Sequence, residues 1–404
     1  MAERVIVSQI GARHRYLIPR VLEKNRLLYR LYTDSTRYSV LGRLSQFMLD
    51  FGFETESAKR LVNRDPNISH NKIYTSDLLF FKRLINSIWK NHDSLNYSLP
   101  FTGMGKVCER WGIGKADCVY GMYFENIEFL RYAKSKGLKV IVDIYEQPST
   151  YKSLAREIAA IPELQMFQYL IPIYEAKASI RETYITELLE LADYYTLPSK
   201  CVEISLHEFA SFDSRKAFIL PYASSISLTK YNWHPVKHRL LFVGSDAINK
   251  GLIYCAKAAT ELKTKYPDLD FRVAGINPGV LDLLPPYNNL TFLGFLDKNQ
   301  LVQEYCSAEA MVFPTLNEGF AGSVIEAAAC GCPVITTENC GADRESFPAL
   351  FVETRNVESI VDAVEKLFEE EDLGRYLSMK LYDYASSLDS DRYEKRLVEV
   401  INRI

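Results

Sequence analysis

The sequence predicts an α/β protein of two doubly wound domains, each a parallel sheet covered by helices, which face each other across a cleft. Continuous apolar runs such as LKVIVDIY alternate with amphipathic stretches such as FENIEFLRYAKSKG, a pattern typical of buried parallel strands between helices. The alternation occurs twice, on either side of the polar stretch SSISLTKYNWHPVKH. With 404 residues, the chain is also too long for one hydrophobic core.

The first alternation opens with the strand-like run RVIVSQI and the helical run RYLIPRVLEKNRL, and it closes with AFILPYA. We assign residues 1–224 to this domain and residues 225–238 to a linker. Residues 51–100 do not fit the strand–helix alternation, so we expect a helical insertion there.

The second alternation begins at RLLFVGS and continues through DFRVAG, LTFLGFL, AMVFPT and PVITT, with helical stretches between these runs. It predicts a second domain over residues 239–386. The last stretch, SDRYEKRLVEVINRI, is amphipathic and predicts a helix over residues 387–404. We expect this helix to cross back to the first domain.

Composition places the protein among soluble globular proteins, since 48% of residues are hydrophobic and 25% are charged. The eight cysteines include no CxxC pair, which fits a reducing cytosol. No apolar run approaches the roughly 18 residues that a membrane-spanning helix needs. We therefore expect a cytoplasmic protein that is neither exported by a signal peptide nor inserted as a helix.

Charge is unevenly distributed although the net charge is only −3. Residues 1–100 hold 16 Lys and Arg against 9 Asp and Glu, whereas residues 226–404 hold 18 against 26. The basic part suggests an anionic partner, such as a phosphorylated substrate or the inner face of the membrane; a chance imbalance is the alternative. The aromatic and basic stretch KIYTSDLLFFKRLINSIWKN supports peripheral docking, unless it packs on its own domain. No nucleic acid partner is expected.

Two loops follow predicted strands of the second domain, where ligands bind to parallel sheets. In VGSDAINKG, Gly244 permits close backbone approach, a helix N-terminus follows and Lys250 adds a cation, an arrangement suited to a diphosphate. Most such turns bind nothing, so this loop alone is a weak signal.

The second loop, PTLNEGFAGSVIEA, holds two carboxylates, Glu318 and Glu326. Ser323 is placed to cap the following helix, and Gly319 and Gly322 leave the loop open to a ligand. Both carboxylates suit the vicinal hydroxyls of a sugar, although Glu326 could simply favour the helix dipole. Two acids on one short segment are poorly placed to flank a scissile bond as in a glycosidase, and no third or fourth ligand stands out that would suggest a metal site.

The frame EGFAGSVIEAAACGCPV resembles the Glu-(x)7-Glu signature of the family-4 retaining glycosyltransferases, which have the GT-B fold. FVGSDAINKG, CGADRE and LTFLGFLDKNQLVQEYCSAEAMVFPT are also similar to segments of that family. In the first half, ELLELADYYTLPS and AFILPYA resemble its elements, and IGARHRYLIPRVL occupies the place of its glycine-containing loop.

The resemblance implies transfer of a sugar from a UDP- or GDP-sugar, with retention of configuration and with neither a metal nor another cofactor. Glu318 would contact the donor sugar, Glu326 the ribose and Lys250 the diphosphate. The implied donor site comprises Gly11, Arg13, Gly244, Ser245, Lys250, Phe295, Leu296, Glu318, Gly319, Phe320, Ala321, Gly322, Ser323 and Glu326. The acceptor would be a glycan or a lipid-linked molecule in cell-surface polysaccharide or glycolipid synthesis.

The chain departs from the family pattern at three positions. Ser245 stands where an Arg is usual, and Arg13 or Arg15 could replace that charge. Ala321 replaces a glycine, and no His follows the strand DCVYGMY.

For the catalytic set we name Glu318, Lys250, His14 and Glu146, with Tyr123 as a further candidate to face the acceptor. A structural role is an equal alternative for His14, Glu146 and Tyr123. We interpret the remaining histidines as surface residues: His70, His92, His207, His234 and His238.

Two other functions remain open at this stage. One is a catalytically weak protein that binds a nucleotide sugar and assists an active transferase subunit, because the usual Arg and His are missing. The other is a sugar phosphorylase or epimerase, which the Glu-(x)7-Glu frame disfavours.

Overall fold

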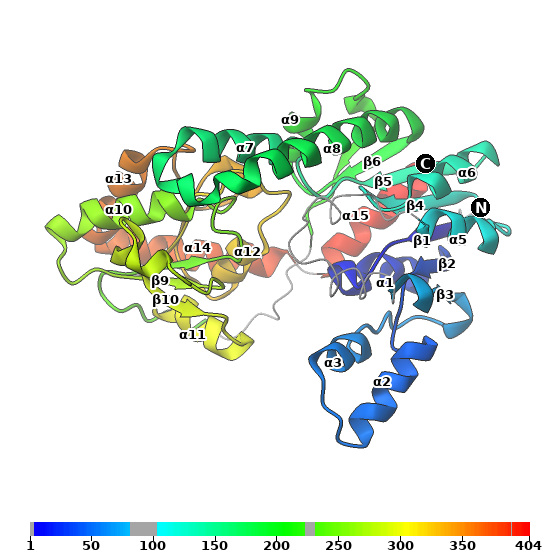
Figure 1. Cartoon of the computed structure of the whole chain (residues 1–404), viewed down its shortest axis with the longest axis horizontal. Helices are drawn as coiled ribbons and strands as arrows, with labels where there is room; N and C mark the ends of the chain where they lie inside the picture. The colour runs from blue at the N-terminus through cyan, green and yellow to red at the C-terminus, as the bar shows by residue number, and fades with distance from the viewer. Residues whose placement is uncertain (1–3, 81–102, 223–230, 389) are drawn as a thin grey trace.

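The computed structural model describes residues 4–80, 103–222, 231–388 and 390–404. Two parallel sheets, each flanked by helices, lie in the two halves of the molecule (Figure 1). The predicted arrangement of two doubly wound domains is therefore confirmed.

The first sheet has seven parallel strands in the order β3-β2-β1-β4-β5-β6-β7. Its central strands are buried along nearly their whole length, which explains why they read as continuous apolar runs. The strands are β1 (Val5–Ser8), β2 (Leu28–Thr33), β3 (Ile73–Thr75), β4 (Cys118–Met122), β5 (Lys139–Asp143), β6 (Tyr194–Leu197) and β7 (Ala217–Ile219). The helices are α1 (Leu17–Lys24), α2 (Val40–Asp50), α3 (Glu56–Val62), α5 (Met104–Trp111), α6 (Ile127–Ser135), α7 (Thr150–Ala160), α8 (Ile171–Leu191) and α9 (Lys200–Leu206).

The stretch expected to be a helical insertion differs from the prediction in two respects. The helical part begins earlier, with α2, and β3 inside the stretch is an edge strand that pairs with β2. Only three residues long and half-buried throughout, β3 has neither an apolar run nor an alternating pattern to reveal it. Residues 81–102, including His92 and much of the aromatic and basic stretch, lie outside the described residues.

The second sheet has six parallel strands in the order β10-β9-β8-β11-β12-β13. Its strands are β8 (Arg239–Val243), β9 (Asp270–Ala274), β10 (Thr291–Gly294), β11 (Ala310–Phe313), β12 (Val334–Thr336) and β13 (Leu350–Phe351). The helices are α10 (Leu252–Lys265), α11 (Lys298–Ser307), α12 (Gly322–Ala329), α13 (Val357–Glu369), α14 (Glu371–Ser387) and α15 (Ser390–Arg403). Short 3-10 helices are η1 (Arg13–Tyr16), η2 (His70–Lys72), η4 (Pro162–Leu170), η5 (Ser214–Lys216), η6 (Leu281–Leu283), η7 (Tyr287–Asn289) and η8 (Glu338–Cys340).

The two halves of the chain exchange helices. The last helix, α15, packs against α1, where Tyr393 and Leu397 join the core around Val5 and Lys24 forms an ion pair with Glu394 at 2.8 Å. In the opposite direction, α7 and η4 lie over the second domain (Figure 1), and Leu154 contributes to the core of that domain. The assignment of residues 1–224 to the first domain missed this second exchange, because an amphipathic pattern shows that a helix has an apolar face but not which core covers it.

None of the helices in the described ranges is long and apolar enough to cross a bilayer.

Candidate functional site

The loop between β8 and α10 places Lys250 at the carboxyl end of the second sheet. Asp246 accepts hydrogen bonds from the backbone N–H groups of Ile248 (3.1 Å) and Asn249 (2.9 Å). A side chain at Gly251, where φ is 74°, would overlap the carbonyl oxygen of Pro314, so the chain turns tightly against the neighbouring loop. Because Asp246 engages these two N–H groups, Lys250 is a cation that this loop offers to an anion.

Asn249 joins this loop to the loop that carries Glu318. Its carbonyl oxygen accepts from Leu316 N (2.8 Å), and its side-chain amide donates to the Asn317 carbonyl (2.8 Å). The two loops are thereby held together, and Lys250 forms an ion pair with Glu318. Burial lowers the pKa of Lys250 to about 8, although the charge of Asp246 opposes this shift.

The N-terminus of α12 is open. Ala321 occupies the N-cap position without a capping side chain, so Ser323 lies in the first turn and does not cap the helix as predicted. In the described part of the chain, no acceptor meets the N–H groups of exposed Gly322 and of Ser323. Such a helix end attracts anions, and Lys250 lies on the adjacent loop.

Glu326 lies one turn further along α12. Its neighbour Tyr305 is fully buried, and burial together with the Glu326 carboxylate raises the pKa of the Tyr305 hydroxyl.

The Glu318–Phe320 segment docks directly on the first domain. Gln147 Nε2 donates to the Glu318 carbonyl oxygen at 2.9 Å, and Ser199 Oγ donates to the Gly319 carbonyl oxygen at 2.6 Å. A side chain at Gly319 would overlap the carbonyl oxygen of Tyr145, so only glycine allows this approach. The candidate site is therefore formed across both domains.

Sequence reasoning missed Gln147 and Ser199. Both follow predicted strands of the first domain, in DIYEQP and YYTLPS, so their position at the cleft edge was readable in the sequence. Their partners were not readable, because the acceptors are main-chain carbonyls of a distant loop.

The loop after β1 is held by two buried carboxylates. Asp34 accepts from Gly11 N at 2.9 Å, and Glu125 accepts from Ile10 N (2.7 Å) and from Arg13 Nη2 (3.0 Å). The N–H of Gly11 is thus engaged within the first domain. Burial raises the pKa of Glu125 to about 6, although the charge of Arg13 opposes the rise.

Arg13 nevertheless lies close to the docked loop. Its guanidinium carbon is 3.6 Å from the centre of the Tyr145 ring, and the carbonyl oxygen of the same tyrosine abuts Gly319. Arg15 is exposed.

The residues after Arg13 are strained. His14, Arg15 and Tyr16 have φ values of 46°, 51° and 59°, three successive left-handed residues, each costing on the order of 1–2 kcal/mol. Such strain persists only where the surroundings enforce it, and it concentrates at functional sites.

His14 stacks on Tyr222 with ring centres 3.7 Å apart, and Tyr222 makes an edge contact with Phe320 at 6.3 Å. Tyr222 is in turn anchored by donating its hydroxyl to Asp143 at 3.0 Å. Burial and the charge of Arg13 lower the pKa of His14 to about 4. In the described chain His14 Nε2 has no hydrogen-bond partner, and the ring of Tyr222 lies between the imidazole and Phe320 of the Glu318–Phe320 segment.

Of the other predicted residues, one is exposed and the rest contact other parts of the protein. Phe295 projects from the end of β10 with 69% of its surface exposed, while Leu296 packs on the second core. Glu146 forms an ion pair with Arg181 of α8, and Tyr123 is fully buried in the first core. Glu146 is thus engaged within the first domain and Tyr123 lies in its core; the catalytic role of Glu146 stays a prediction.

His238 is a correction to the sequence analysis. It is buried and its Nδ1 lies 2.9 Å from Asp268, whereas we expected a surface residue. All eight cysteines are free thiols. Among the described residues, no group of three or more His, Cys, Asp or Glu side chains is arranged to hold a metal ion.

In a comparison with known proteins, residues 237–370 match a family described as glycosyl transferases group 1. A 2-deoxystreptamine N-acetyl-D-glucosaminyltransferase from Niallia circulans is 29% identical over 152 residues, which cover 35% of this chain. The match covers 39% of that relative's own length.

Two solved structures resemble the whole chain. A sucrose-phosphate synthase from Thermosynechococcus elongatus gives a TM-score of 0.64 at 15% identity, covering 99% of this chain and 98% of the other. HepE from Anabaena, in complex with UDP-glucose, gives 0.62 at 11% identity, covering 100% of both chains. With the two parallel sheets, these likenesses show the GT-B fold that the sequence predicted.

Proposed function

We propose that the protein is a glycosyltransferase that uses a nucleotide sugar, either a UDP- or a GDP-sugar, as donor. The observation that carries this proposal is the pairing of Lys250 with Glu318 beside the open N-terminus of α12. A cation next to free N–H groups suits a diphosphate, and a carboxylate at the same place suits sugar hydroxyls.

Donor binding would rearrange this pair. Lys250 and the N–H groups of Gly322 and Ser323 would bind the diphosphate, which frees Glu318 to accept hydrogen bonds from the sugar. Glu326 would accept from the ribose, and the exposed ring of Phe295 would stack on the base. Catalysis would then depend on positioning and on stabilising the leaving diphosphate.

The first domain would present the acceptor. His14, neutral at physiological pH because of its lowered pKa, lies close enough to the donor loop to contact either substrate. We retain transfer with retention of configuration and without a metal or other cofactor as part of the proposal, on the strength of the Glu-(x)7-Glu frame. The acceptor would be a glycan or a lipid-linked molecule.

One structural neighbour and one relative agree with this proposal. The HepE structure contains UDP-glucose, and the Niallia circulans relative is named an N-acetyl-D-glucosaminyltransferase.

A thermal-shift screen over UDP-, GDP- and CMP-sugars tests donor binding, because a ligand that binds only the native state raises the melting temperature. We expect one UDP- or GDP-sugar to raise it in the wild type and to have a weaker effect in Lys250→Met. An absence of stabilisation by every nucleotide sugar would contradict the proposal.

A further inference from the structure

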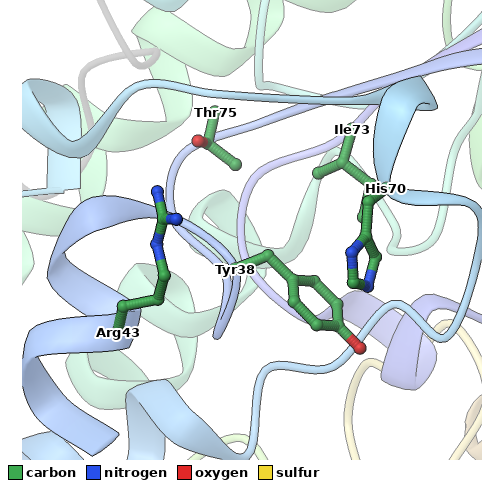
Figure 2. Close-up of a pocket in the computed structure, with 5 residues that line it drawn as sticks. All are labelled: Tyr38, Arg43, His70, Ile73 and Thr75. Carbon is green, nitrogen blue, oxygen red and sulfur yellow. The ribbon is translucent and has the colours of Figure 1, made fainter. Parts of the chain in front are cut away.

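A cavity of about 420 Å³ opens in the first domain, away from the residues named above for the donor. It is lined by Tyr38, Arg43, His70, Ile73 and Thr75 (Figure 2). Thr75 ends β3, and the next residue donates its N–H to the carbonyl oxygen of Asp34 at 2.7 Å. Because Asp34 also accepts from Gly11 N, the Thr75 end of the cavity lies at the same edge of the first sheet as the loop after β1.

Arg43, an exposed side chain of α2, gives this cavity a positive charge. No carboxylate of the described chain lies within 4 Å of its guanidinium. The two neighbouring arginines differ, since Arg37 pairs with Asp65 at 3.0 Å and Arg64 pairs with Asp34 at 3.1 Å. Asp65 is occupied further by the Tyr38 hydroxyl, which donates to it at 2.8 Å.

The other walls of the cavity suit a polar ligand with an anionic group. Figure 2 shows Arg43 and Thr75 on one side and the rings of Tyr38 and His70 against each other on the other side. These two rings have centres 4.0 Å apart and are tilted to each other by 42°, so they offer an aromatic wall to a sugar ring or a similar moiety. The hydroxyl of Thr75 adds a donor beside the guanidinium.

We propose that this cavity binds a phosphate group carried by the acceptor, with Arg43 as its principal ligand. Guanidinium and phosphate match as a bidentate charge-assisted pair, and a cavity whose Thr75 end lies at the same sheet edge as the loop after β1 suits a second substrate. This inference rests on the proposed glycosyltransferase function and names its acceptor class.

The phosphate could belong to a soluble phosphorylated sugar or to a lipid. The lipid source deserves a test because α2, which carries Arg43, exposes the apolar residues Val40, Leu44, Phe47 and Met48. Their spacing places them along one face of the helix.

The imidazole resonance of His70 provides a direct readout. The chain has six histidines, so selective labelling gives few signals, and a His70→Gln variant assigns the one from the cavity. Inorganic phosphate and glycerol 3-phosphate are titrated against the wild type, Arg43→Ala, Arg43→Lys and the control Arg60→Ala. Arg60 is an exposed arginine on α3 outside the cavity.

We expect the His70 signal to move on phosphate addition in the wild type and in Arg60→Ala. Affinity should fall about tenfold in Arg43→Ala and less in Arg43→Lys, which keeps the charge but loses the bidentate geometry. For a lipid phosphate, flotation compares the binding of the same variants to phosphatidylglycerol vesicles and to phosphatidylcholine vesicles. Binding in either arm that depends on Arg43 supports the proposal and identifies the source.

The proposal is overturned if neither soluble probe perturbs His70 and vesicle binding does not depend on Arg43, or if the response in every arm is the same in Arg43→Ala. Nucleotide-sugar stabilisation, measured on the same samples, should be unchanged in Arg43→Ala. If the wild type binds a nucleotide sugar but not phosphate, only the phosphate site is refuted. If the wild type binds no nucleotide sugar, the proposed function is refuted.

Discussion

At the scale of single residues, Lys250 is a half-buried cation of the candidate site. It pairs with Glu318 in the structure, and burial lowers its pKa to about 8. Lysine is charged below its pKa, so the side chain is largely charged at pH 7 and largely neutral at pH 9.

The affinity for UDP or GDP should therefore fall as pH rises. Between pH 7 and pH 9 we expect a loss of about tenfold, because above pH 8 binding must include uptake of a proton by Lys250. Calorimetric titration at several pH values measures it. Lys250→Met should bind more weakly at pH 7 and lack this slope, and a slope that persists in the variant would assign the titration to another group.

Gly319 tests the close contact between the domains. Gly319→Ala places a methyl group against the carbonyl oxygen of Tyr145, so we expect a melting temperature several degrees lower, equivalent to about 1–3 kcal/mol. The control is Gly322→Ala, whose added methyl meets no atom within 4 Å. Equal melting temperatures of the two variants would show that the Gly319 contact does not hold the domains together.

At the scale of elements, the exchange of α7 depends on Glu157. Only 3% of the Glu157 side chain is exposed. Its carboxylate accepts a hydrogen bond from Arg355 Nε at 2.6 Å and is also bonded to the Tyr254 hydroxyl. Both partners belong to the second domain, so Glu157 fixes a helix of the first half of the chain to the second core.

Glu157→Gln should lower the free energy of unfolding by about 1–3 kcal/mol, because the neutral amide no longer forms the ion pair with Arg355. The partial exposure of Arg355 limits the loss. Glu163→Gln is the matched control, since Glu163 pairs with Lys257 across the same contact at 2.8 Å but is more exposed. Its effect should stay within about 1 kcal/mol. Denaturant unfolding distinguishes the two, and equal losses would contradict a special role for Glu157.

The elements also show what the sequence could and could not predict. Buried strands such as β5 and β8 were predictable, because burial on both faces leaves a continuous apolar run. The edge strand β3 was not, since it is three residues long and half-buried. For α7, the sequence gives an apolar face but not the core that covers it.

At the scale of the whole molecule, the candidate site depends on contact between the domains. Gln147 and Ser199 of the first domain hold the main chain of the loop that presents Glu318. The frame around Glu318 identified the loop from sequence, because its spacing is specific. The side chains of the other domain that bind the carbonyl oxygens of this loop are selected by the packing of the two domains. That packing cannot be read from a short stretch of sequence.

The proposed donor role of Glu318 is tested most directly by release of free nucleotide from a nucleotide sugar without acceptor. The wild type and the control Glu358→Gln, at an exposed position on α13, should release UDP or GDP slowly. Glu318→Gln should release it about 100-fold more slowly while still binding the nucleotide. An unchanged rate in Glu318→Gln would contradict a donor role for Glu318. Nucleotide binding without turnover in the wild type would instead indicate a catalytically weak partner subunit.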